Sequence, residues 1–306
     1  MHTIGLDIGG TTIKGGLVDR NGRVLRSAAR PTDASDIGKL VGTLENLVGH
    51  LSRNDPVGAV GVGVPGLRSS DTGETVVSPN VACLAGVNVE AVLGDRVAPP
   101  VVSRNDADMS AWGELCAGAG IGTRYMVCLT LGTGVGSGII LGGRLYNGSR
   151  GYASEAGHLV VDPEGLPCSC GSRGCLEAVA SATGIVALAR AWLGPGEREA
   201  VPEPWTAAGL YEAARAGHKA SRTVFEQAGR YLGIACASLI NVLNPEAIVL
   251  AGGVMEAGDM ILAPAVREAR LRAFDASFGA CRIVRAKLGT DAGVVGAALF
   301  AAHVAG

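Results

Sequence analysis

Three cysteines and one histidine have the residue types and the spacing of a metal site. The stretch CSCGSRGCLE contains Cys168, Cys170 and Cys175, and His158 lies ten residues before the first of them. Three thiolates and one imidazole form the closed tetrahedral set of structural Zn²⁺, which leaves no open position for catalysis. Proline and glycine residues around these cysteines allow a short loop to wrap an ion. The sequence therefore predicts a structural zinc loop, with buried or redox-active thiols as the alternative.

Two glutamates flank this cluster. Glu155 lies three residues before His158, and Glu177 lies two residues after Cys175. Solvated surface carboxylates are the ordinary interpretation of such residues. A rigid metal loop would nevertheless hold both side chains steady, and fixed carboxylates accept hydrogen bonds from vicinal sugar hydroxyls. We therefore expect the zinc loop to support a sugar site.

A third carboxylate lies where a strand is expected to give way to a helix, in SRNDADMSAWGELCAG. Asp106 at such a position is a routine helix cap. It is also placed to accept the proton of a substrate hydroxyl that attacks a γ-phosphoryl group, since phosphoryl transfer needs one carboxylate to orient the nucleophile. The amide of Asn105 can donate to and accept from neighbouring hydroxyls.

The elements that position these residues follow a repeated pattern. Residues 3–30 have the pattern of a strand, a glycine-rich turn, a strand, a tight turn and a strand, and residues 125–147 repeat it. Helices and strands alternate after each repeat, and they are expected at 41–51, 59–66, 99–106, 221–243 and 247–253. An apolar helix is expected at 291–306, and residues 194–205 are expected to form a surface loop. We predict two similar α/β lobes with a cleft between them.

Both repeats contain a glycine-rich turn that follows a strand. Backbone N–H groups of GGTT (residues 9–12) and GTG (residues 132–134) can point at phosphate oxygens, although plain hairpin turns are the alternative for either one alone. GVGVPG contains a proline and no helical pattern follows it, which argues against a dinucleotide fold. No P-loop motif occurs. Asp7 precedes the first turn and would face Mg²⁺ or cap the turn.

Composition narrows the class of protein. The chain has 306 residues, of which 48% are hydrophobic, so it is long enough for two domains with sizeable cores. A net charge of −2 argues against nucleic acid as a partner. The start MHTIGLDIGG lacks the features of a signal peptide, and no apolar run approaches the ~20 residues of a membrane span. These features predict a cytoplasmic protein without a membrane partner.

Taken together, these residues resemble the ROK family of bacterial sugar kinases and repressors, in particular its glucokinase-like members. The resemblance spans essentially the whole chain. It rests on LDIGGTTIKGGLVD (6–19), the E-x-G-H motif at 155–158, CSCGSRGCLE (168–177), LINVLNPEAIVLAGGV (239–254) and LGTDAGVVGAALF (288–300).

The resemblance implies a two-lobed, actin-like (ribonuclease-H-like) α/β fold with a duplicated βββαβαβα core. Residues 1–107 would form a small lobe that the helix at 291–306 completes, and residues 108–290 would form a large lobe. It also implies phosphorylation of the 6-hydroxyl of a hexose, most simply glucose, by ATP with Mg²⁺, in a homodimer or homotetramer.

The family's site residues carry over to matching positions of this chain. Asp106 would be the general base. The implied sugar contacts are Gly66, Asn105, Asp106, Glu155, His158 and Glu177, with one nitrogen of His158 binding zinc and the other facing the sugar. The implied nucleotide contacts are Asp7, Gly9, Gly10, Thr11, Thr12, Lys14, Gly132, Thr133, Gly134, Gly252 and Gly253.

One departure from the family pattern leaves the sugar open. After Ser78-Pro79-Asn80, glucokinases of this type usually continue with a tryptophan-containing stretch, whereas this chain continues VACLAGVNVEAVL. An amino sugar such as N-acetylmannosamine, N-acetylglucosamine or kanosamine is therefore the alternative substrate, and polyphosphate is the alternative donor. A sugar-responsive repressor is less favoured, because the phosphate strand begins at residue 3 and the charge is balanced. A sugar- or nucleotide-binding module without catalysis would be favoured only if Asp106 were replaced.

Overall fold

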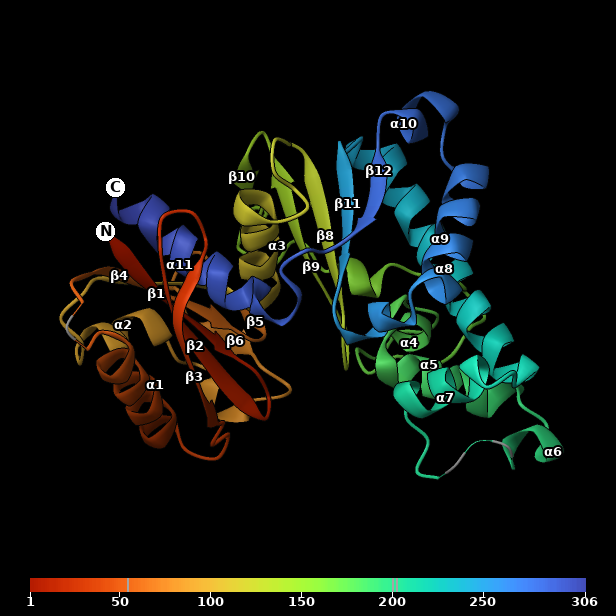
Figure 1. The fold of residues 1–306 in the computed structure, drawn as a ribbon, viewed down its shortest axis with the longest axis horizontal. Helices are drawn as coiled ribbons and strands as arrows, with labels where there is room; N and C mark the ends of the chain where they lie inside the picture. The colour runs from red at the N-terminus through yellow and green to blue at the C-terminus, as the bar shows by residue number, and fades with distance from the viewer. Residues whose placement is uncertain (54, 200, 202) are drawn as a thin grey trace. The chain divides into compact units, whose positions relative to one another are not determined.

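A computed structural model describes residues 1–53, 55–199, 201 and 203–306 (Figure 1). The chain forms two five-stranded sheets with helices packed against them, and a short hairpin of β5 (Leu67–Arg68) and β6 (Thr75–Val77). The two predicted repeats are the opening strands of the two sheets. The mixed α/β architecture expected from the sequence is therefore confirmed.

The first sheet has the strand order β3-β2-β1-β4-β7. Its strands are β1 (His2–Ile8), β2 (Thr12–Val18), β3 (Val24–Pro31), β4 (Val57–Val64) and β7 (Val101–Asn105). The hairpin strands β1 to β3 pair antiparallel, whereas β4 pairs parallel with both β1 and β7. The carboxyl ends of β1, β4 and β7 consequently lie at one edge of the sheet, where side chains that follow these strands can meet.

Helix α1 (Ile37–Leu51) covers this sheet because its leucines recur at helical spacing. Leu40, Leu44, Leu47 and Leu51 are fully buried in a cluster with apolar side chains of the sheet. Asp36 caps the helix by accepting a hydrogen bond from the backbone of Lys39 at 2.8 Å. The other helical elements before the second sheet are η1 (Ala82–Leu84), α2 (Val89–Gly94) and α3 (Asp106–Ala117).

The second sheet has the matching order β10-β9-β8-β11-β12. Its strands are β8 (Met126–Leu131), β9 (Val135–Leu141), β10 (Arg144–Leu145), β11 (Ala247–Ala251) and β12 (Arg282–Arg285). The helices of this half are α4 (Glu177–Ala180), α5 (Ala182–Trp192), α6 (Pro195–Arg198), α7 (Ala207–Arg215), α8 (Lys219–Leu243), α9 (Asp259–Arg272) and α10 (Asp275–Gly279). The single-turn helices are η2 (Ala156–His158), η3 (Gly253–Ala257) and η4 (Gly289–Asp291), and α11 (Ala292–Ala305) follows.

The predicted surface loop at 194–205 contains the short helix α6. Residues 200 and 202 of that loop lie outside the described residues. Among the residues that the structure describes, no helix has both the length and the apolar character needed to cross a membrane.

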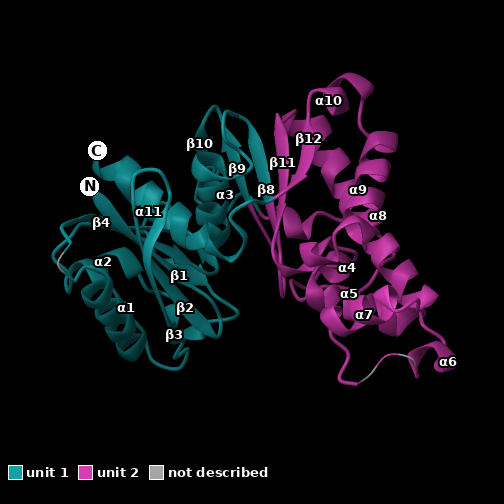
Figure 2. Cartoon of the chain, viewed as in Figure 1, with its two compact units in different colours: residues 1–128, 138–154, 286–306 teal, residues 129–137, 155–285 magenta. Residues whose placement is uncertain are grey.

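The chain divides into two compact units (Figure 2). The first unit comprises residues 1–128, 138–154 and 286–306, and the second comprises residues 129–137 and 155–285. The chain therefore crosses between the units four times. The division into lobes at 1–107 and 108–290 remains a prediction from the sequence.

Helix α11 packs against β1, β4 and α3 within the first unit at backbone distance. A Cβ atom on Gly5 would lie 1.8 Å from the carbonyl oxygen of Val294, and one on Gly61 would lie 1.8 Å from that of Ala297. On the helix itself, a Cβ atom on Gly296 would lie 1.7 Å from the carbonyl oxygen of Met109 in α3. Only glycine permits this approach, so these positions fix α11 against the sheet.

Replacing Gly296 with alanine should therefore destabilise the protein. The added methyl group meets rigid backbone, so we expect the free energy of unfolding to fall by about 1–3 kcal/mol or more. The matched control is Gly42→Ala in α1, where a Cβ atom meets nothing within 4 Å. That change should stabilise by up to about 1 kcal/mol through helix propensity. Urea denaturation of both variants tests the difference, and equal stabilities would contradict the packing argument.

Candidate functional site

Two carboxylates face each other across a glycine in the first unit. Asp7 is the penultimate residue of β1, and Asp106 is the first residue of α3, directly after β7. Gly63 of β4 lies between them: a Cβ atom there would be 3.3 Å from Asp7 Oδ1 and 3.4 Å from Asp106 Cα. The side chain of Asp7 also lies against Gly293 of α11, where a Cβ atom would be 2.7 Å from the carboxylate. Because Gly63 and Gly293 have no side chains, there is space at these positions for the carboxyl groups of Asp7 and Asp106.

Both acids have raised pKa values because they are desolvated. Burial raises the pKa of Asp7 to about 6, although the positive charge of Lys14 opposes the shift. Burial raises the pKa of Asp106 to about 7, with a further contribution from the negative charge of Asp7. A carboxylate with a pKa near neutrality is suited to accept a proton from a substrate hydroxyl.

The pair also suits a divalent cation. The carboxylate of Asp7 accepts no hydrogen bond from any described residue, so its oxygens are available to a ligand. Carboxylate oxygens beside a phosphate turn are the hard ligands that Mg²⁺ prefers. The residues present therefore fit Mg²⁺, held by Asp7 directly or through water.

Asn105, rather than Asp106, caps α3. Its Oδ1 accepts hydrogen bonds from the backbone of Ala107 at 2.8 Å and of Asp108 at 3.3 Å. Its Nδ2 donates to the carbonyl oxygen of Gly66 at 3.0 Å. Gly66 has a φ of +107°, and a Cβ atom there would lie 2.1 Å from the carbonyl oxygen of Val77. Asp106 Oδ1 also accepts a hydrogen bond from the backbone of Ala107 at 2.9 Å, but the residue at the cap position of α3 is Asn105.

The first glycine-rich turn joins β1 to β2. The amide of Gly9 donates to the carbonyl oxygen of Thr12 at 3.1 Å, and the hydroxyl of Thr32 donates to the carbonyl oxygen of Gly9 at 2.7 Å. Gly10, Thr11 and Thr12 are exposed. Lys14 donates to the carbonyl oxygen of Thr290 at 3.3 Å. Hydrogen bonds at Gly9 therefore fix the turn, while the exposed residues 10–12 are accessible to a phosphate group.

The predicted metal ligands come together in the second unit. One ligand atom each from His158, Cys168, Cys170 and Cys175 lies within 4.8 Å of the others. Cys170 Sγ is 3.7 Å from Cys175 Sγ, and His158 Nδ1 is 3.7 Å from Cys168 Sγ. Tetrahedral Zn²⁺ with Zn–S bonds of ~2.3 Å separates its sulfur ligands by about 3.8 Å, so the residues fit this ion. All three cysteines are free thiols, and the 3.7 Å between Cys170 Sγ and Cys175 Sγ is too long for a disulfide bond.

The two flanking glutamates have different surroundings. His158 Nε2 lies 3.9 Å from the carboxylate of Glu155, on the opposite side of the ring from the cysteines. Glu177 instead accepts a hydrogen bond from the backbone of Val135 at 3.0 Å and one from the hydroxyl of Ser169 at 3.1 Å. Glu177 thus ties the zinc loop to the strand that follows the second glycine-rich turn.

That second turn borders a largely apolar pocket of ≈ 480 Å³ in the second unit. Thr183 donates to the carbonyl oxygen of Thr133 at 2.8 Å, which fixes the turn to the start of α5. Gly252 has a φ of +93°, and a Cβ atom there would lie 2.3 Å from the carbonyl oxygen of Leu131. The pocket is lined by Gly132, Thr133, Ala182, Thr206, Ala207, Ala208, Tyr211, Phe225, Gly253, Val254, Glu256 and Ala257.

Sequence reasoning identified some of these residues and missed others. The structure brings the four cluster residues together, and it places Asp7 beside Asp106. Sequence reasoning missed Gly63, Thr183 and the pocket walls from α7 and α8. For Gly63, the run of glycines in a buried strand was a usable signal, since glycine inside a strand marks close approach. The pocket walls have no such local signal. Which residues contact sugar or nucleotide remains a prediction.

The duplicated sheet, with a glycine-rich turn at the start of each copy, defines a protein of the actin-like, ribonuclease-H-like α/β class. Within that class the chain belongs to the ROK family, whose family model matches residues 3–304.

Its relatives include enzymes named as glucokinases. The chain is 38% identical to a glucokinase of Halalkalibacterium halodurans, over 96% of this chain and 92% of that one. It is 36% identical to a glucokinase of Thermotoga maritima, over 97% and 96%. It superposes on a ROK family glucokinase from Streptomyces griseus, solved with glucose and AMPPNP, with a TM-score of 0.85 at 35% identity, covering 99% of this chain and 100% of that chain.

The raised pKa of Asp106 has a consequence for stability. An aspartate ordinarily titrates near 3.8, so between that pH and about 7 the folded state holds a proton that the unfolded state lacks. The contribution of Asp106 to stability is therefore lost as pH rises from about 4 to 7. Asp106→Asn should raise the free energy of unfolding at pH 8, on the order of 1–3 kcal/mol in metal-free buffer, and should raise it little at pH 4.

Denaturation at several pH values, with EDTA present, measures this effect. Asp71→Asn is the matched control, because Asp71 is exposed on a turn of the same unit. It should change stability little at any pH. A stability gain for Asp106→Asn that does not vary with pH would contradict the argument.

Proposed function

We propose that this protein is an ATP-dependent hexokinase that phosphorylates the 6-hydroxyl group of glucose. The observation that carries the proposal is the pair Asp7 and Asp106, two desolvated acids at the carboxyl ends of β1 and β7, which flank β4 in the first sheet. Membership of the ROK family and identities of 35–38% to glucokinases support the same activity.

In the proposed reaction, Asp106 accepts the proton of the 6-hydroxyl group as its oxygen attacks the γ-phosphorus of ATP. The new O–P bond forms as the bond to the β-phosphate oxygen breaks, which yields hexose 6-phosphate and ADP. Backbone N–H groups of the turns at 9–12 and 132–134 would bind the phosphates. Mg²⁺ would neutralise phosphate charge when bound, and Asp7 would hold it.

The nucleotide base would occupy the apolar pocket of the second unit. Its lining includes the aromatic residues Tyr211 and Phe225, and Glu256 contributes a polar group. An apolar pocket with few polar groups suits a flat aromatic base. Gly252 and Gly253 would allow the chain to pass close to the nucleotide, as the family resemblance implied.

The sugar hydroxyls would be bound by Gly66, Asn105, Asp106, Glu155, His158 and Glu177. Asn105 has one amide hydrogen beyond those that its structural bonds use, and His158 has one nitrogen turned away from the cysteines. We also infer that the enzyme works in the cytoplasm as a homodimer or homotetramer, in keeping with its family.

An assay of ADP release against a panel of sugars tests the proposal. Glucose should give the highest kcat/KM, and the amino sugars N-acetylmannosamine, N-acetylglucosamine and kanosamine are the alternatives, since no tryptophan follows Ser78-Pro79-Asn80. Polyphosphate replaces ATP in a parallel series. An absence of phosphate transfer to every sugar from either donor would refute kinase function.

Replacing Asp106 with asparagine should reduce kcat at least ~10²-fold, because asparagine keeps the size of the side chain but cannot accept the proton. The KM for sugar should change far less. For the wild-type enzyme, kcat/KM should fall as pH drops below about 7, since the protonated acid is inactive. Near-normal turnover of Asp106→Asn would exclude Asp106 as the base.

Cys170→Ser should lose a structural metal. We expect about one zinc per chain in the wild type by mass spectrometry, and a large loss in the variant, with lower thermal stability. The KM for sugar should rise steeply while the KM for ATP changes little, because Glu155, His158 and Glu177 are joined to the same loop. Cys116→Ser, which changes an exposed thiol of the first unit, is the control. Active wild-type protein with less than about half an equivalent of zinc would overturn this assignment.

A further inference from the structure

The segment that precedes Glu155 is held by an anchor of its own. Residues 146–154 connect β10 to Glu155, and Ser154 is the last residue of the first unit before the chain enters the second. This segment is not part of any helix or strand. Its course therefore depends on contacts with other parts of the first unit.

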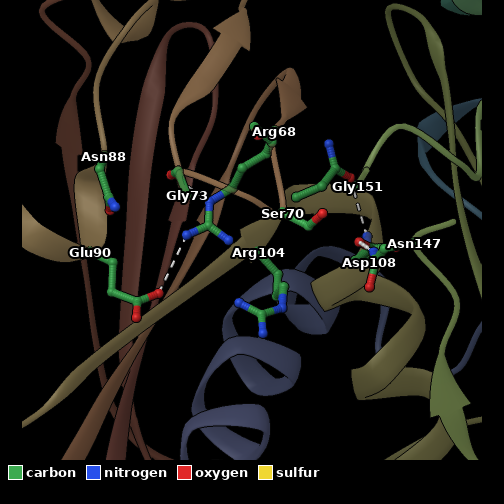
Figure 3. Close-up of a pocket in the computed structure, with 11 residues that line it drawn as sticks. Arg68, Ser70, Gly73, Asn88, Glu90, Arg104, Asp108, Asn147 and Gly151 are labelled. Atoms are coloured by element: carbon green, nitrogen blue, oxygen red, sulfur yellow. Dashed lines mark hydrogen bonds and ion pairs between the residues drawn. The ribbon is translucent and has the colours of Figure 1, made fainter. Parts of the chain in front are cut away.

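The strongest of these contacts joins the segment to α3. Asn147 Nδ2 donates a hydrogen bond to Asp108 Oδ2 at 2.6 Å (Figure 3). Asp108 is 4% exposed and lies in the first turn of α3, two residues after Asp106. Because a buried carboxylate must be compensated by donors, the bond to Asn147 is worth more than an exposed one. The bond thus ties the segment to the helix that begins with the proposed base.

A second contact joins the segment to the short hairpin. The amide of Ser70 donates to the carbonyl oxygen of Arg150 at 2.9 Å. Gly151 has a φ of +87°, and a Cβ atom there would lie 2.5 Å from the carbonyl oxygen of Arg68. Figure 3 shows Gly151, Ser70, Asn147 and Asp108 around one polar pocket of ≈ 300 Å³, which Asn105 also lines.

The segment then closes on itself. The amide of Ala153 donates to the carbonyl oxygen of Asn147 at 3.2 Å, and the hydroxyl of Ser154 donates to the carbonyl oxygen of Tyr146 at 2.9 Å. Ser154 has a φ of +68°, a left-handed conformation that a non-glycine residue adopts at a cost of about 1 kcal/mol or more. Such a conformation persists only where surrounding contacts impose it. The backbone is therefore constrained at the residue directly before Glu155.

We propose that Asp108 and Asn147 are positioning residues for sugar binding: their hydrogen bond fixes residues 147–154 and thereby the backbone that presents Glu155. This inference rests on the proposed function, in which Glu155 binds sugar hydroxyls. Neither Asp108 nor Asn147 contacts the sugar in this proposal. Both residues act by fixing the segment of residues 147–154.

Kinetics of Asn147→Ala test the proposal. The KM for sugar should rise about tenfold, whereas kcat and the KM for ATP should stay within about twofold of wild type. Asn147→Ser is a second variant in case the first does not fold. Arg150→Ala is the matched control, because Arg150 contributes its backbone carbonyl to the anchor and its exposed side chain forms no hydrogen bond or ion pair with the described residues. Its constants should match wild type.

A double variant in which the two residues are exchanged tests whether restoring the hydrogen bond restores sugar binding. In Asp108→Asn/Asn147→Asp the donor and acceptor change places, so the hydrogen bond can form again, and the KM for sugar should return to within about threefold of wild type. Asn147→Asp alone removes the donor and places a second carboxylate beside Asp108, so it should resemble Asn147→Ala. Amide hydrogen exchange of residues 147–155 should be at least tenfold faster in the single variants than in wild type, Arg150→Ala and the exchanged pair.

The outcomes separate this inference from the proposed function. If the wild type phosphorylates a sugar but Asn147→Ala lowers only thermal stability, with the KM for sugar unchanged, the positioning role is refuted and the kinase stands. Unchanged amide exchange in the single variants would refute the anchor itself. If the wild type phosphorylates no sugar, the proposed function fails and this inference fails with it.

Discussion

The approach of α11 to within backbone contact of β1, β4 and α3 is possible only where side chains are missing, and the geometry of the first unit depends on it. Gly5, Gly61 and Gly296 bring the helix against the sheet. Glycines have the same effect at the candidate site, where Gly63 and Gly293 leave space for the carboxyl groups of Asp7 and Asp106. Because backbone meets backbone, the helix has little room to shift, so the carboxylate of Asp7 is confined on two sides. The same close packing keeps water away from the two acids, and this desolvation raises the pKa values of Asp7 and Asp106.

Carboxylates other than Asp7 and Asp106 hold the rest of the arrangement together. Glu114 of α3 is fully buried and accepts hydrogen bonds from the backbone of Ala119 at 2.7 Å and of Leu288 at 2.8 Å. Asp108 holds Asn147, and Glu177 holds Val135. In each case one acid joins segments that are distant in the sequence. A buried acid such as Glu114 or Asp108 is costly unless its oxygens are satisfied, so the bonds of these two residues strongly favour one arrangement of the segments that they join.

Features encoded over short stretches could be predicted from the sequence. The hairpin strands and glycine-rich turns follow from alternation and turn residues, and the Cys₃His cluster follows from spacing within one loop. The capping role at α3 was open, because Asn105 and Asp106 are both good caps and only the backbone geometry chooses between them. The bonds of Glu177 to Val135 and of Asp108 to Asn147 span about forty residues, and no local pattern announces such a pairing. The pocket of the second unit combines α5, α7, α8 and η3, so it exists only after tertiary folding.

The place of α11 in the chain has a consequence for biosynthesis. Residues 286–306 belong to the first unit, yet the ribosome makes them after every residue of the second unit. The nascent chain can therefore complete its second unit while the first still lacks the helix that covers β1 and β4. During that interval the face later occupied by Val294, Ala298 and Phe300 stays open, and it is an apolar surface that chaperones recognise and that favours aggregation. The first unit stays in that vulnerable state until residues 286–306 have been made and have packed against it.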